Sequence, residues 1–113
     1  MVYPSNLVVA VDESDATLRV RLEGEFDLAA VPLVERILDR VSHLPAARRV
    51  VLDLRGVSFL DLAGLRTILR ADARGRAETF DVLVVRPRGT ASRIFTLTRV
   101  GERLNLVNEL EAA

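Results

Sequence analysis

The residues best suited to chemistry in this sequence are carboxylates that follow apolar segments. Asp27 comes shortly after the alternating segment 17–23, and Asp61 follows the apolar segment 49–54. Two carboxylates near each other can act as acid and base when their surroundings separate their pKa values. The chain has no Cys or Lys and a single His, so neither carboxylate has the partner that nucleophilic catalysis needs. Catalysis by Asp27 and Asp61 is therefore the least favoured hypothesis.

Other catalytic and cofactor chemistries lack their residues. Without Cys there are no disulfides, thiolate nucleophiles or cysteine zinc ligands, and the lone His43 fits a helix cap or a surface position better than a metal site. Neither the G-x-G-x-x-G pattern nor the lysine-containing phosphate loop is present. We expect no metal, no cofactor and no enzymatic activity.

The two aspartates also have structural interpretations. An aspartate directly before Leu62 can accept hydrogen bonds from the free N–H groups that begin a helix, so capping is the favoured role of Asp61. Asp27 stands where another helix is about to begin, and capping and a functional role remain equally open for it.

The elements that position these residues follow from hydrophobic periodicity. Apolar or alternating segments predict strands, and apolar residues at helical spacing predict helices. The expected strands are 7–11, 17–23, 49–54, 79–85 and 104–107, and the expected helices are 30–41, 61–74 and 89–99. A polar turn at 12–15 joins the first two strands, and Gly75 and Gly101 are expected to end the second and third helices. Ile94, Phe95 and Leu97 are expected to face inward.

Strands that alternate with helices predict an α/β fold with parallel strands joined by right-handed crossovers. Because the segment 17–23 alternates apolar and polar residues, one face of the sheet is expected to meet water. We therefore predict one domain over residues 1–113, with a mixed, mostly parallel sheet of four to five strands and helices mainly on one face. Either edge strand of such a sheet is open to pairing with a second copy.

In open α/β sheets the functional loops follow the carboxyl ends of the strands. Here those loops are 24–28, 55–63 and 86–89. They are expected to bring six polar residues to one edge of the sheet: Glu25, Asp27, Ser58, Asp61, Arg86 and Arg88.

Composition limits the partners. The 113 residues are 50% hydrophobic, with 16 basic and 16 acidic residues, so the formal net charge of zero gives no electrostatic reason to expect nucleic-acid binding. Arg66, Arg70 and Arg74 recur every fourth residue on the second helix, where a solvated face is favoured over a docking strip for an acidic partner. No targeting segment or membrane-spanning run is apparent, so we expect a cytoplasmic protein that does not insert into a membrane.

Three stretches together resemble the STAS domains of anti-sigma-factor antagonists, and they span nearly the whole chain. They are "GEFDLAAVPLVERIL" (24–38), "VVLDLRGVSFLDLAGLRTIL" (50–69) and "RPRGTASRIFTLTRVGERLNLV" (86–107). The family has a G-E-(apolar)-D segment, and a strand–turn–helix segment, D-L-x-x-V-x-(F)-x-D-S-S-G-L, that carries its regulatory site. The matches are Gly24, Glu25, Phe26 and Asp27 in the first, and Asp53, Leu54, Val57, Phe59, Asp61, Gly64 and Leu65 in the second.

The resemblance implies a bacterial partner switch, in which the antagonist binds an anti-sigma factor that is also a serine kinase and so frees the sigma factor. Phosphorylation of the second serine then abolishes binding. In this chain the two serine positions hold Leu62 and Ala63, so the acceptor hydroxyl is missing. The implied module is either locked in its binding-competent state or switched elsewhere, and Ser58 and Thr67, read as turn and helix-surface residues, are the nearest hydroxyls.

The phosphate that Ala63 cannot accept would carry about −1.5 to −2 charge, which would have to be dehydrated in an apolar contact beside Asp61. Leu62 and Ala63 also make the turn more apolar, as a contact surface requires, unless Leu62 packs under its own domain. Gly64 is expected to let a partner approach closely. The expected partner-binding residues are Asp27, Leu28, Ser58, Phe59, Asp61, Leu62, Ala63 and Gly64.

A second hypothesis comes from a different class of assembly. STAS domains also occur as small subunits of lipid-transporting ABC ATPases and within larger stress-signalling complexes, and the missing phosphorylation site raises this alternative.

Overall fold

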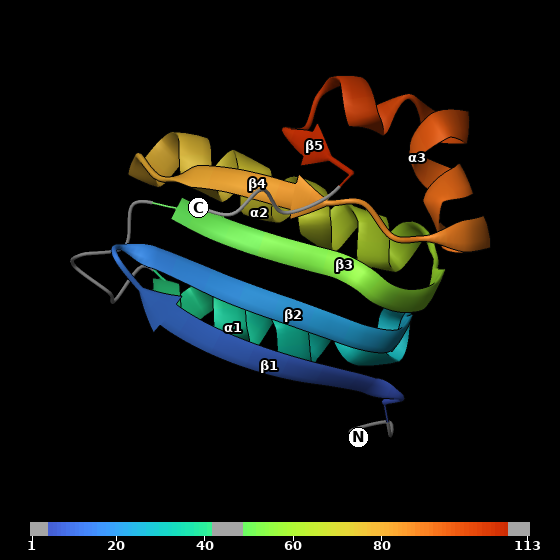
Figure 1. The fold of residues 1–113 in the computed structure, drawn as a ribbon, viewed down its shortest axis with the longest axis horizontal. Coiled ribbons are helices and arrows are strands. Elements are labelled where there is room, and N and C mark those ends of the chain that lie inside the picture. Colours follow the sequence, from blue (N-terminus) through green and yellow to red (C-terminus); the bar gives the residue numbers. More distant parts are fainter. Residues whose placement is uncertain (1–4, 42–48, 109–113) are drawn as a thin grey trace.

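A computed structural model describes residues 5–41 and 49–108; His43 lies outside these ranges. It forms a five-stranded sheet in the order β1-β2-β3-β4-β5 (Figure 1). The strands are β1 (Leu7–Ser14), β2 (Thr17–Phe26), β3 (Arg49–Leu60), β4 (Asp81–Val85) and β5 (Leu106–Val107). The helices are α1 (Val31–Val41), α2 (Leu62–Glu78) and α3 (Arg93–Thr98), with short 3-10 turns η1 (Leu28–Ala30), η2 (Gly89–Ser92) and η3 (Val100–Glu102).

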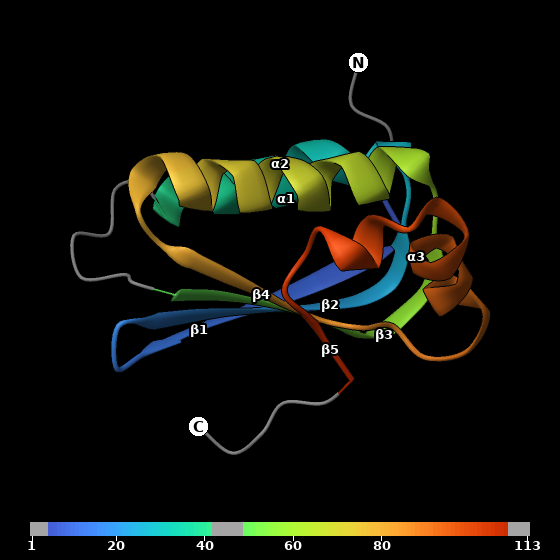
Figure 2. The ribbon, with the colours of Figure 1, turned by 90° about the horizontal axis from the view of Figure 1, so that it is seen from above.

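The predicted fold class is confirmed. β1 pairs antiparallel with β2, and the other neighbouring strands are parallel. α1 and α2 lie side by side on the same face of the sheet (Figure 2). Leu18, Val20 and Leu22 of β2 are buried against these helices, whereas Arg19 and Arg21 point to the opposite face, as the alternation predicted.

The first hairpin turns later than predicted. β1 continues to Ser14, and the turn consists of Asp15 and Ala16 alone, which have φ values of 49° and 63°. Two positive φ values in a two-residue turn match the right-handed twist of the strands on either side. Polar residues 12–14 were wrongly assigned to the turn because the end of this edge strand is exposed on both faces.

β2 and β3 are longer than predicted and extend into the segments expected to be loops. Pairing between them continues to Phe26 and Leu60, across register shifts between Arg21 and Glu23 and between Gly24 and Glu25. Gly24 has a φ of 110°, which a side chain would strain. Because a bulge interrupts the alternation of side chains, the period-2 pattern stops before the strands do.

Two helix predictions need correction. α2 continues past Gly75 to Glu78, and a Cβ on Gly75 would lie 2.6 Å from the Phe80 carbonyl oxygen, so this glycine serves close packing of the helix. The third predicted helix is divided between η2 and α3; Phe95 is buried as expected, but Leu97 is 81% exposed.

No helix in the described ranges has the length and apolar character needed to cross a membrane.

Candidate functional site

The carboxyl ends of β2 and β3 lie side by side. Phe26 pairs with Leu60, the Asp61 N–H donates to the Phe26 carbonyl at 3.4 Å, and the Ser58 hydroxyl donates to the Gly24 carbonyl at 3.2 Å. The segments that follow the two strands therefore share one edge of the sheet, as the parallel topology requires.

Large apolar side chains are exposed along this edge. Leu28 is 71% exposed, Phe59 50% and Leu62 60%. Leu62 therefore does not pack under its own domain, which was the alternative that the sequence left open. We call this edge the β2–β3 surface; it consists of Asp27, Leu28, Ser58, Phe59, Asp61, Leu62 and Ala63. A cluster of exposed apolar groups with polar neighbours is typical of a protein contact site.

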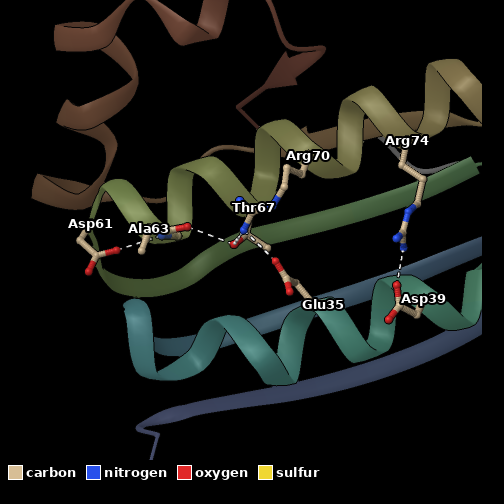
Figure 3. Close-up of polar contacts among 8 residues, drawn as sticks. Glu35, Asp39, Asp61, Ala63, Thr67, Arg70 and Arg74 are labelled. Atoms are coloured by element: carbon tan, nitrogen blue, oxygen red, sulfur yellow. Dashed lines mark hydrogen bonds and ion pairs between the residues drawn. The ribbon is translucent and has the colours of Figure 1, made fainter.

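Asp61 caps α2, as predicted. Its Oδ1 accepts a hydrogen bond from the Gly64 N–H at 2.9 Å (Figure 3), and its carbonyl accepts the first helical bond from the Leu65 N–H at 3.0 Å. The cap fixes where the helix begins and so fixes the direction in which Leu62 and Ala63 project.

Gly64 does not contribute an accessible surface. It is buried, and a Cβ there would lie 2.5 Å from the Phe26 carbonyl oxygen and 2.7 Å from Leu60 Cδ1. The missing side chain allows α2 to begin directly against the ends of β2 and β3. The expectation that Gly64 admits a partner is corrected, because the chain itself fills that space.

Ala63 is half-buried, and its carbonyl accepts a hydrogen bond from the Thr67 hydroxyl at 3.0 Å (Figure 3). Thr67 is only 1% exposed, so its interpretation as a helix-surface residue was wrong. A buried, hydrogen-bonded hydroxyl is out of reach of a kinase in the folded state. Ser58 is exposed, but it lies on β3 and not in a turn.

Asp27 begins η1 without capping it through its side chain. Only its backbone carbonyl accepts the Ala30 N–H, at 3.0 Å. Its Oδ1 is buried and accepts no hydrogen bond within the described ranges. Such an unsatisfied acceptor is costly unless water or a partner supplies a donor, which distinguishes Asp27 from Asp61.

The three arginines that recur along α2, Arg66, Arg70 and Arg74, differ in their contacts. Arg70 binds Glu35 at 2.7 Å and Arg74 binds Asp39 at 2.8 Å, so two interhelical ion pairs join α2 to α1 (Figure 3). These pairs line a groove of about 340 Å³ between the helices. Arg66, one turn after Leu62, is exposed and forms no ion pair with any residue that the structure describes.

The other polar residues expected at this edge lie elsewhere or are engaged. Glu25 accepts a hydrogen bond from the Asn6 side chain at 2.9 Å. Arg88 lines a hollow of about 300 Å³ with Arg21 and Arg55 on the face of the sheet without helices. Arg86 has a buried Nε with no hydrogen-bond partner in the described part, and its backbone N–H donates to Val107 of β5. These residues do not form one polar cluster with Asp27 and Asp61.

Asp53, which matches the motif, has a structural role that its residue type did not reveal. It is buried, and Arg55 holds its two oxygens at 3.0 and 2.8 Å. Burial disfavours the charged carboxylate, but the hydrogen bonds from the Arg55 side chain and backbone and the charges of Arg55 and Arg21 outweigh it. The pKa of Asp53 therefore lies below its ordinary value.

Among the residues that the structure covers, no group of three or more His, Cys, Asp or Glu is placed to hold a metal ion. The geometry at the β2–β3 surface offers apolar contact area, one unsatisfied carboxylate oxygen and one nearby guanidinium. This arrangement is suited to binding a protein.

Known structures share this fold. The crystal structure of an anti-sigma factor antagonist from Mycobacterium paratuberculosis is 27% identical, with a TM-score of 0.82 over 97% of this chain and 92% of that chain. The unphosphorylated form of the anti-sigma factor antagonist SpoIIAA is 19% identical, with a TM-score of 0.75 over 90% of each chain. The phosphorylated form of the Bacillus cell fate determinant SpoIIAA is 19% identical, with a TM-score of 0.69 over 90% of this chain and 93% of that one.

The family model described as "Mlab, STAS domain" matches residues 9–108. This match includes all the strands except the first two residues of β1, together with all three helices and the whole β2–β3 surface. The chain belongs to the STAS domain family.

Proposed function

We propose that this chain is a non-catalytic binding protein, an anti-sigma factor antagonist that binds an anti-sigma factor of the serine-kinase type and so frees a sigma factor. The observation that carries the proposal is the exposure of Leu28, Phe59 and Leu62 at the carboxyl ends of β2 and β3. The likeness to an anti-sigma factor antagonist over most of both chains supports it.

The chemistry of the surface suggests how the partner is held. Burying an exposed Leu62 against a partner contributes about 1.5–3 kcal/mol. The unsatisfied Oδ1 of Asp27 would accept a hydrogen bond from a donor on the partner, and Arg66 would attract an acidic side chain at the margin of the contact.

The same surface supports binding that phosphorylation at position 63 does not regulate. The Ala63 side chain has no hydroxyl that could accept a phosphate, and the nearby Thr67 hydroxyl is buried. With Ser58, the exposed hydroxyl of the β2–β3 surface, unmodified, the binding-competent state is the permanent one, and regulation acts through the amounts of the two proteins or through the partner.

Affinity capture from the native extract, followed by calorimetry with the purified partner, tests this proposal. We expect a kinase-like anti-sigma factor to be retained and Leu62→Asp to weaken its binding about 100-fold, because a desolvated charge replaces an apolar contact. Leu97→Asp is the matched control, since Leu97 is even more exposed than Leu62 but lies on α3, and it should leave the affinity unchanged.

Retention of an ABC-type ATPase in place of an anti-sigma factor would overturn the proposal in favour of a transporter subunit, for which the missing acceptor at Ala63 is the supporting observation. Equal effects of Leu62→Asp and Leu97→Asp would show that the β2–β3 surface is not the binding site.

A further inference from the structure

The two edges of the sheet differ in how they are protected. β5 forms one edge with only Leu106–Val107, and so short an edge offers little for another strand to pair with. β1 forms the other edge with eight residues (Figure 1). It pairs with β2 without a bulge, and its residues 7–11 contain no charge and no proline. The usual devices that keep an edge strand from pairing are missing from this half of β1.

β1 also exposes apolar side chains on both of its faces. Val8 is 67% exposed and Val11 is 48% exposed, and because side chains alternate along a strand they point to opposite faces of the sheet. Val11 lines a hollow of about 370 Å³ with Ile37 of α1 on the helical face. A strand added beside β1 would cover apolar groups above and below the sheet.

The two-residue turn determines which backbone groups of β1 point outward. Residues that flank such a turn form a hydrogen-bonded pair, so Ser14 is bonded to Thr17 and every second residue before it is bonded to β2. The same even-numbered pattern includes Asn6, whose carbonyl accepts a hydrogen bond from the Glu25 N–H of β2 at 3.3 Å. The N–H and C=O groups of Val9 and Val11 therefore point away from the sheet.

The outward groups suit a second copy of the same strand. The Leu7 N–H is already satisfied by the Ser5 hydroxyl at 3.1 Å, which leaves Val9 and Val11 as the central pair. With a two-fold axis at Ala10, each Val9 lies opposite a Val11 and the four N–H groups meet four carbonyls. The small Ala10 side chains face each other, and Asp12 lies opposite Val8 of the second copy, away from the other Asp12.

From these features we infer that the chain forms a symmetric dimer through antiparallel pairing of β1 with β1 of a second copy. The two sheets then continue as one across the paired β1 strands, which we call the seam. The two β2–β3 surfaces lie at opposite ends of this seam. Each copy keeps its own binding surface free. Because the seam is narrow, the dimer is of the weak class, with a dissociation constant on the order of 0.1 mM.

Amide hydrogen exchange at two protein concentrations tests the inference on the unaltered chain. We expect the Val9 and Val11 amides to exchange more slowly at about 1 mM than at about 0.01 mM, concentrations on either side of that constant. The amides of Val8, Ala10 and Asp12, which face β2, should be protected equally at both. Exchange of Val9 and Val11 that does not depend on concentration would overturn the dimer.

Two substitutions on the same face test the register by sedimentation equilibrium. Ala10→Glu lies opposite Arg21 of its own chain, so the monomer tolerates it, but it places like charges opposite each other across the axis and should weaken the dimer about fivefold. Val8→Lys lies opposite Glu23 of its own chain and Asp12 of the second copy, and should leave the dissociation constant within about twofold.

A wild-type chain that sediments as a 12.5 kDa monomer at the higher concentration contradicts the inference, as does a folded Ala10→Glu variant that dimerises like the wild type. Because the β2–β3 surface is not part of the seam, Ala10→Glu should bind the anti-sigma factor with unchanged affinity. Failure of the dimer is thus distinguishable from failure of the proposed function.

Discussion

At the scale of single residues, the turn between β3 and α2 combines a fixed backbone with an exposed apolar tip. Asp61 caps the helix and Gly64 lets it begin against β2, while Leu62 projects outward and Ala63 is half-buried between them. The capping role of Asp61 was predictable because it needs only an aspartate directly before a helix. The burial of Gly64 was not, because it depends on how closely β2 approaches the start of α2. Neither was the burial of Thr67, which lies beside Glu35 and Leu38 of α1.

Gly64→Ala should lower the free energy of unfolding by about 2 kcal/mol, because the new Cβ meets a backbone carbonyl that cannot move aside. Urea denaturation followed by circular dichroism measures this change. Ala77→Lys, at an exposed position of the same helix, is the control and should change stability by less than about 0.5 kcal/mol. Equal stability of Gly64→Ala and the wild type would contradict the close packing.

At the scale of elements, the local pattern indicated the type and order of each strand and helix but not where each ended. Gly75 suggested a helix end because glycine commonly follows one, yet its neighbour in space is Phe80, which no local pattern reveals. The true end uses Thr79, whose φ of 65° is strained for a β-branched residue. The ends of β2 and β3 were missed for a similar reason, since bulges break the alternation that marks a strand.

Thr79→Gly should raise the free energy of unfolding by about 1 kcal/mol, because glycine adopts the left-handed conformation without strain. Glu78→Gly, one residue earlier and still helical, should lower it by about 1 kcal/mol. Thermal and urea denaturation of the two variants and the wild type measure these opposite changes in the free energy of unfolding. A destabilised Thr79→Gly variant would show that the Thr79 side chain contributes more than its backbone strain costs.

At the scale of the whole molecule, the α/β class and the helices on one face followed from alternating segments and connection rules, and the structure confirms both. The meeting of Asp27 and Asp61 loops at one edge also followed from parallel topology. The separation of Arg88 from that edge did not, because the loop after β4 turns it to the other face of the sheet, where it joins Arg21 and Arg55 around Asp53.

The stability of the molecule should depend on Asp53 in acid. Its pKa is lowered in the folded state, so its stabilising contribution is complete above the unfolded pKa of about 3.9 and is lost as pH falls through the lower folded pKa. Asp53→Asn should therefore flatten the loss of stability below about pH 4. The same variant should be about 1–3 kcal/mol less stable at neutral pH, because Arg55 loses its charged partner. If the free energy of unfolding fell equally steeply for the variant and the wild type below about pH 4, this role would be contradicted.

The most direct test of the proposed binding surface, which on this proposal phosphorylation does not switch off, is calorimetric titration of the proposed anti-sigma factor partner before and after incubation of the chain with that partner's kinase activity and ATP. We predict the same dissociation constant in both titrations and no phosphate by intact mass, because Ala63 has no hydroxyl. Ala63→Ser is the comparison; phosphorylation should weaken its binding about 100-fold, since the new charge must be dehydrated beside Asp61. Loss of wild-type affinity after ATP, or phosphate on Ser58, would contradict the claim.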